Sequence, residues 1–177
     1  MKQIVLVGLG NIGRRHLESF FRSSYSMNIH IIEIDEANIN KGKEIANLKA
    51  KKHHKTYFHT KLPEDLAIDF LLLATTSQNR FDIASNIISR NKVLAVIFEK
   101  VVFQKLDDYE IMANLLEANQ IDAWINNWPR LAQYNQEIKT RLATSSFLEM
   151  EVKGSYWNLA CNASHFIDLF VFYTNNN

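Results

Sequence analysis

Three glycines near the start of the chain have the spacing of a phosphate-binding turn. Gly8, Gly10 and Gly13 follow the apolar run Ile4–Val7, and a helical segment begins near Asn11. In such a turn the first glycine allows a sharp bend. The second lets backbone approach a pyrophosphate, and the third lets the helix pack on the strand. Free N–H groups and the positive dipole end of the helix would face the phosphates. The same glycines can also form a plain turn.

A carboxylate lies where a dinucleotide would need one. Glu33 ends a second apolar run, about 20 residues after Gly13, where an acid accepts hydrogen bonds from the adenosine ribose. Asp35 is the alternative ribose ligand, and either acid could merely begin the next helix. A carboxylate here repels a 2′-phosphate, so NAD is favoured over NADP, although Arg14 and Arg15 could soften that preference.

Polar residues follow two later apolar runs. Thr75 and Thr76 could line a cofactor cleft, or they could cap the next helix through their hydroxyl groups. Glu99 and Lys100 follow another run, and a lysine there would project toward a nicotinamide and hold a substrate oxygen. A lysine after a strand is, however, usually a surface residue.

A histidine near the end of the chain is a candidate general base. His165 lies three residues before Asp168 in an apolar segment, so the two share one helical face. An imidazole titrates near neutrality and can remove an alcohol proton, although a lone histidine on such a helix is more often a core residue. His53, His54 and His59 have no acid or cysteine at ligand spacing, so no metal site is predicted.

Alternating segments predict the elements that would position these residues. Up to residue 125 the order is strand, helix, strand, which indicates a doubly wound parallel sheet with helices on both faces. Ligands bind such sheets at the carboxyl ends of the strands. The expected strands are Gln3–Val7, Ile29–Ile34, Thr56–His59, Ile68–Ala74, Val93–Phe98 and Ile121–Ile125; the expected helices are Asn11–Ser23, Glu36–Leu48, Phe81–Ser89 and Leu106–Ala118, with a helical turn at Pro63–Leu66.

The pattern changes after Asn126. A helix is expected at Gln133–Leu142, a long strand at Ser146–Trp157 and a buried helix at Leu159–Phe172. We therefore predict a dinucleotide-binding Rossmann domain over residues 1–126 and the start of an incomplete α+β second domain over residues 127–177.

Composition narrows the function classes. The 177 residues are 47% apolar with a net charge of +1, which gives no case for a nucleic-acid partner. No apolar stretch approaches the roughly 20 residues that span a bilayer. The lone Cys161 rules out an internal disulfide, and we expect a cytoplasmic protein.

The motifs in this order resemble the Gfo/Idh/MocA family of NAD(P)-dependent sugar and cyclitol oxidoreductases. The resemblance implies a dinucleotide in the first domain and a sugar against the second. It implies that Lys100 orients the substrate and that His165 moves the hydroxyl proton. The matching segments are Gly8-Leu9-Gly10-Asn11-Ile12-Gly13-Arg14-Arg15-His16, Glu33, Ala74-Thr75-Thr76-Ser77, Glu99-Lys100, Asn126-Asn127-Trp128-Pro129-Arg130 and Ser164–Asp168. The candidate cofactor-binding residues are Gly8, Gly10, Asn11, Ile12, Gly13, Glu33, Thr75, Thr76 and Glu99.

The chain departs from the family in three places. Val101 replaces a usual proline, Cys161 stands where many members carry an aspartate, and members are commonly about twice as long. Two hypotheses follow. One is an oxidoreductase acting on a sugar or nucleotide-sugar hydroxyl. The other is a truncated NAD-binding relative that acts only with a partner chain, or not as an enzyme. A third class, a methyltransferase, fits Lys100 and His165 poorly.

Partners are expected from apolar surface. An incomplete second domain would leave part of Leu159–Phe172 uncovered, and exposed apolar patches usually mark interaction sites. We therefore expect a homo-oligomer, or pairing with a separate C-terminal chain.

Overall fold

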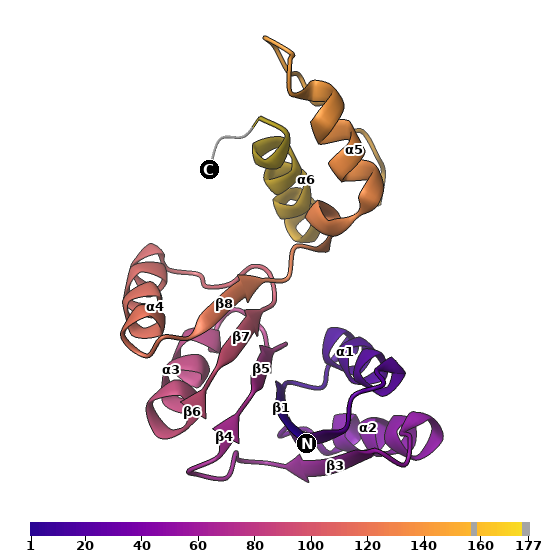
Figure 1. Ribbon diagram of the computed structural model, residues 1–177, viewed down its shortest axis with the longest axis vertical. Helices are drawn as coiled ribbons and strands as arrows, with labels where there is room; N and C mark the ends of the chain where they lie inside the picture. The colour runs from indigo at the N-terminus through magenta and orange to yellow at the C-terminus, as the bar shows by residue number, and fades with distance from the viewer. Residues whose placement is uncertain (157–158, 175–177) are drawn as a thin grey trace. The chain divides into compact units, whose positions relative to one another are not determined.

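The computed structural model describes residues 1–156 and 159–174, with the backbone alone for residues 159–161. The chain divides into two compact units, Met1–Ile125 and Asn126–Asn177. The first is an α/β unit, and the described part of the second is built from helices (Figure 1). Each unit is described by itself below.

The first unit contains a six-stranded parallel sheet in the order β3-β2-β1-β5-β7-β8. Counting only these six strands along the chain, the order is 3-2-1-4-5-6, that of a dinucleotide-binding fold. The direction of winding reverses between β1 and β5, which is where such sheets bind ligands. The strands are β1 (Lys2–Val7), β2 (Met27–Ile32), β3 (His54–His59), β5 (Phe70–Leu73), β7 (Ala95–Phe98) and β8 (Asp122–Ile125).

Helices cover both faces of the sheet. Figure 1 shows α1 (Asn11–Arg22) and α2 (Glu36–Lys49) on one side and α3 (Arg80–Arg90) and α4 (Leu106–Ala118) on the other. Alternate residues of β1 feed two separate cores, because successive side chains of a strand point to opposite faces. This explains the continuous apolar run of a central parallel strand. Ile4 and Leu6 pack with the α1–α2 layer, whereas Val5 and Val7 pack with the α3–α4 layer.

Two expected strands are each divided in two. Residues 68–74 form β4 (Ala67–Ile68) and β5, and residues 93–98 form β6 (Lys92–Val93) and β7, while β4 and β6 pair as a separate two-stranded sheet. The Asp69 carboxylate accepts hydrogen bonds from Gln3 N at 2.7 Å and Lys2 Nζ at 3.1 Å. The Gln3 hydrogen bond lowers the pKa of Asp69. A side chain therefore occupies the hydrogen-bonding position that a strand carbonyl would have filled.

Two other expected elements are absent from the described residues. Pro63–Leu66 forms a turn rather than a helix, and Asp65 has a positive φ of 59°, which a right-handed helix excludes. Residues 146–156 form no strand, and Trp157 lies outside the described residues. A strand needs a neighbour for its N–H and C=O groups, and the described part of the second unit provides no strand to pair with.

The second unit consists of η1 (Trp128–Leu131), α5 (Gln133–Leu142) and α6 (Leu159–Thr174). The buried Asn135 links all three, because its Nδ2 donates to Pro129 O at 2.8 Å and its Oδ1 accepts from the Tyr173 hydroxyl. Among the described helices of either unit, none is long and apolar enough to cross a membrane.

Candidate functional site

A cleft of about 800 Å³ opens in the first unit where the sheet order reverses. Ligand sites commonly have volumes of about 300–1,000 Å³. Five of the residues expected to bind a cofactor line it: Gly8, Gly10, Glu33, Thr75 and Thr76. They follow β1, β2 and β5, so the carboxyl ends of three neighbouring strands supply them.

Two glycines permit the close contacts of the turn. Gly8 has a positive φ of 90°, and a Cβ there would lie 3.0 Å from Ala74 C. A Cβ on Gly13 would lie 2.0 Å from Gly8 O, so only glycine lets α1 begin this close to the end of β1. A Cβ on Gly10 would meet no atom within 4 Å, which leaves the backbone at the cleft open to a ligand.

The Glu33 carboxylate is held by backbone N–H groups at the edge of the cleft. Oε2 accepts from Leu9 N at 2.7 Å, and Oε1 accepts from Ile34 N at 2.8 Å and Asp35 N at 3.0 Å. A carboxylate offers about four acceptor positions, so these three bonds leave capacity for a ribose hydroxyl. Asp35, the alternative ribose ligand, instead caps α2 by accepting from Asn38 N at 2.8 Å.

Arg80 connects the segments after β5 and β7. Its side chain is 2% exposed, and its guanidinium donates to the carbonyl oxygens of Thr75 and Glu99. Further bonds reach Val101 O at 2.5 Å and Val102 O at 3.1 Å. Burial lowers the pKa of Arg80, and the nearby Glu99 charge partly offsets this effect. The cleft residue Thr75 is thereby tied to the chain around Lys100.

Glu99 and Lys100 follow β7 but are not part of the described lining of the cleft, and neither are Asn11, Ile12 and Gly13. Glu99 is buried, and its Oε1 lies 2.6 Å from His16 Nε2, which links the end of β7 to α1. Lys100 is half-buried, and its peptide bond with Val101 is cis.

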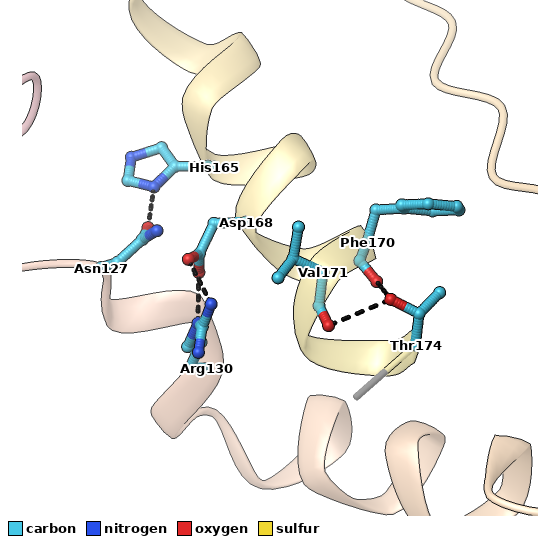
Figure 2. A network of polar contacts seen from close by, with 7 residues as sticks. All are labelled: Asn127, Arg130, His165, Asp168, Phe170, Val171 and Thr174. Carbon is cyan, nitrogen blue, oxygen red and sulfur yellow. Dashed lines mark hydrogen bonds and ion pairs between the residues drawn. The ribbon is translucent and has the colours of Figure 1, made fainter. Parts of the chain in front are cut away.

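A polar network lies in the second unit. His165 and Asp168 stand one turn apart on α6, and both face the segment around η1 (Figure 2). His165 Nδ1 lies 2.5 Å from Asn127 Oδ1, whereas Asp168 accepts two bonds from Arg130, at 2.7 Å from Nε and 2.6 Å from Nη2. The Asp168 hydrogen bond raises the pKa of Arg130. The shared helical face therefore holds two separate pairs.

Several lining residues were not anticipated from the sequence. The structural role of Arg80 was not anticipated either. A cation in the first turn of α3 is unfavourable next to the positive end of the helix dipole, so its position there could have indicated that it has a specific hydrogen-bonding role. The other polar lining residues lie on loops and helix faces, where no local sequence pattern distinguishes them from ordinary surface residues. The unanticipated polar lining residues include Asn38, Lys61, Asn79, Asp82, Asn86 and Arg90.

The histidines outside α6 have separate partners. His53 Nε2 lies 3.2 Å from Ser23 O, while His54 Nδ1 accepts from Lys51 N at 3.4 Å. His59 Nε2 lies 3.1 Å from His30 Nδ1 on the neighbouring strand. Within residues 1–156 and 159–174, no three histidine, cysteine or acidic side chains form a group that could hold a metal ion.

The residues of the cleft fit a dinucleotide. Gly10 leaves its backbone open, Glu33 retains acceptor capacity, and the buried Thr75 Oγ1 has no hydrogen-bond partner among the described residues. Strand order, glycine turn and acid together define a Rossmann-type dinucleotide-binding unit.

The chain belongs to the Gfo/Idh/MocA oxidoreductase family, whose NAD-binding Rossmann-fold model matches residues 2–126. The predicted family, fold class and NAD cofactor are thereby confirmed. No curated protein sequence matches the chain significantly.

Solved structures share the fold at low sequence identity. The WlbA (WbpB) dehydrogenase of Thermus thermophilus, crystallised with NAD and UDP-GlcNAcA, has a TM-score of 0.72 and 14% identity; the match covers 98% of this chain and 63% of that one. Myo-inositol 2-dehydrogenase of Lactobacillus plantarum has a TM-score of 0.74 and 13% identity, and the match covers 98% of this chain and 56% of that one. An Agrobacterium radiobacter oxidoreductase, crystallised with NAD+, L-tartaric acid and magnesium, has a TM-score of 0.72 and 18% identity. The match covers 97% of this chain and 54% of that one. The chain thus spans between half and two thirds of their lengths.

Proposed function

We propose that this protein is an NAD-dependent oxidoreductase that acts on a hydroxyl or ketone group of a sugar or nucleotide sugar. The observation that carries the proposal is the cleft, which joins the open backbone at Gly10, the Glu33 carboxylate and the buried Thr75 hydroxyl. Structural relatives with NAD and UDP-GlcNAcA, or named for myo-inositol, support the substrate class.

In the proposed binding mode, backbone N–H groups at Gly10, Asn11, Ile12 and Gly13 face the pyrophosphate at the start of α1. The Glu33 carboxylate accepts hydrogen bonds from the ribose hydroxyls and disfavours a 2′-phosphate, so NAD is preferred to NADP. Thr75 and Thr76 contact the cofactor from the end of β5, and Glu99 supports the adjoining segment through its contact with His16.

Lys100 and His165 are proposed to act on the substrate. When bound, the nicotinamide supplies or accepts a hydride. The Lys100 ammonium holds the substrate oxygen, and the His165 imidazole accepts the hydroxyl proton during oxidation and returns it during reduction. The residues belong to different units, so each role is assigned from residue type and family resemblance, with the contact to Asn127 as support for His165.

Cofactor binding is tested by calorimetric titration of the wild type with NAD and NADP. We expect NAD to bind more tightly, and Glu33→Gln to weaken NAD about tenfold because a charged hydrogen-bond acceptor is lost. The same variant should narrow the difference between NAD and NADP. Absence of binding at about 1 mM NAD, the upper end of usual KM values, would contradict the proposal.

Turnover is tested with a panel of UDP- and dTDP-sugars in both reaction directions. Lys100→Met and His165→Gln should each lower kcat, by about 10²–10⁴ for the proton-transfer residue. Lys105→Met changes an exposed lysine of the same unit and serves as the matched control. Unchanged rates in both site variants would remove the assigned roles.

A second candidate is an NAD-binding protein that completes its substrate site only with a partner chain or a second copy. Exposed apolar side chains in the second unit favour it, since Leu131 is 83% exposed, Phe147 77% and Ile167 64%. Light scattering after size exclusion distinguishes the cases: a stable monomer that turns over sugars supports the first candidate alone.

A further inference from the structure

The contact between Asn127 and His165 has a chemical direction. The Asn127 amide oxygen lies 2.5 Å from His165 Nδ1 (Figure 2). An amide oxygen only accepts hydrogen bonds, so in the neutral ring the proton must be on Nδ1 and the lone pair on Nε2. Both side chains are half-buried, which favours a persistent contact.

Asn127 is held on an anchored segment. It directly precedes η1, where Pro129 is buried and its carbonyl oxygen accepts from Asn135 Nδ2 at 2.8 Å. Asn135 in turn accepts from Tyr173, which lies on α6 with His165. The amide and the imidazole thus belong to elements that are joined at a second point, and this limits how far they can move apart.

The neighbouring carboxylate does not orient this ring. Asp168 directs both of its carboxylate oxygens to Arg130, at 2.7 and 2.6 Å. A carboxylate on Nδ1 would favour the imidazolium form, whereas a neutral amide orients the ring without that bias.

We propose that Asn127 is a positioning residue that holds the His165 imidazole as its Nδ1–H tautomer, so that Nε2 presents the lone pair to the substrate hydroxyl. This inference rests on the proton-transfer role proposed above for His165. The Arg130–Asp168 pair engages both oxygens of the neighbouring carboxylate, and the contact at His165 Nδ1 is made by the Asn127 amide oxygen.

The direct test is the tautomer itself. Nitrogen-15 NMR of the full chain labelled in histidine, recorded above neutral pH, distinguishes Nδ1–H from Nε2–H rings, and His165→Gln identifies the signal. We expect Nδ1–H in the wild type and in Asn127→Asp, and a change to mainly Nε2–H in Asn127→Leu. Asn114→Leu, which alters an exposed asparagine in the first unit, should change nothing. An Nε2–H ring in the wild type, or one unaffected by Asn127→Leu, would overturn the proposal.

Kinetics give a second readout. Asn127→Leu should lower kcat about tenfold or more with little change in KM, since a positioned base contributes about 10²–10⁴ in rate. Asn127→Asp should recover much of that loss and move the low-pH limb of the pH profile for oxidation to higher pH, because a carboxylate favours the imidazolium and a general base must be neutral to act. A pH profile identical in all three proteins would contradict the inference. The spectrum requires no turnover, so an inactive wild type would count against the proposed function while the tautomer still decides the role of Asn127.

Discussion

The two units are stabilised by different kinds of contact. Met1–Ile125 has an apolar core on each face of its sheet, and among the described residues the buried apolar side chains, apart from Pro129, lie between Ile4 and Ile121. In Asn126–Asn177 hydrogen bonds of Asn135 and Asp168 join the helices, two cations lie over the Phe172 ring, and large apolar side chains remain exposed. Apolar burial contributes about 25 cal/mol per Å². We infer that the cleft is preorganised by packing, whereas the histidine network depends on a few hydrogen bonds.

The largest effect is expected from Arg80→Met in the first unit. This change leaves the carbonyl oxygens of Thr75, Glu99, Val101 and Val102 without their buried donor. We expect a loss of about 3 kcal/mol or more in unfolding free energy, and much weaker NAD binding. Urea unfolding and calorimetry measure the two effects. Arg90→Met, at a side chain 56% exposed, should change stability by less than about 0.5 kcal/mol.

Two glycine substitutions distinguish the effect of helix packing on stability from the effect of an open backbone on NAD binding. Gly13→Ala places a Cβ 2.0 Å from Gly8 O and should cost about 2 kcal/mol in unfolding free energy. Gly10→Ala meets no atom within 4 Å, so the fold should persist while NAD affinity falls. The same denaturation and titration measurements apply. Equal stability of both variants would show that the close approach at Gly13 is unimportant.

A smaller and more local effect is expected in the second unit. Arg130→Met removes the two hydrogen bonds to Asp168. The Arg130 side chain is 36% exposed and the Asp168 side chain 22% exposed. Solvent screens such a pair, so the expected loss is about 1 kcal/mol, seen as roughly fivefold faster amide exchange in α6. Arg141→Met on the exposed side of α5 is the control. Faster exchange throughout the sheet as well would contradict the separation of the units.

The smallest effect is a pH dependence of the first unit. Burial lowers the pKa of His30, His54 and His59 below 6.5, and the His59 charge adds to the shift at His30. Well above pH 6.5 these rings are neutral in both the folded and the unfolded states. As the pH falls below 6.5 the unfolded state takes up protons first, so the unfolding free energy decreases.

Urea unfolding at about pH 7.5 and pH 5.5 measures this decrease. His30→Gln should reduce it, because it removes a half-buried ring whose pKa is lowered by burial and by the charge of His59, 3.1 Å away. A stability that rises on acidification would mean that these histidines gain rather than lose protonation on folding.

Local patterns predicted most of the first unit and less of the second. Buried parallel strands and amphipathic helices leave continuous or periodic apolar runs, so all four main helices and all six sheet strands were expected near their observed positions. The break between β4 and β5 at Asp69 was missed, because the hydrogen bonds of Asp69 join residues far apart in sequence. The prediction of a strand at Ser146–Trp157 was wrong for residues 146–156, which form no strand. Alternation of apolar and polar residues does not by itself supply a neighbouring strand to pair with.

Sequence patterns alone were enough to predict the phosphate-binding turn, the acid after β2, the winding of the sheet and the family. Each follows from short-range requirements: absence of a Cβ, strand length and helix periodicity. Three other features required the folded structure: Glu33 rather than Asp35 lines the cleft, Arg80 joins the segments after β5 and β7, and His165 pairs with Asn127 while Asp168 pairs with Arg130. These choices depend on distances between residues remote in sequence, which no local pattern contains.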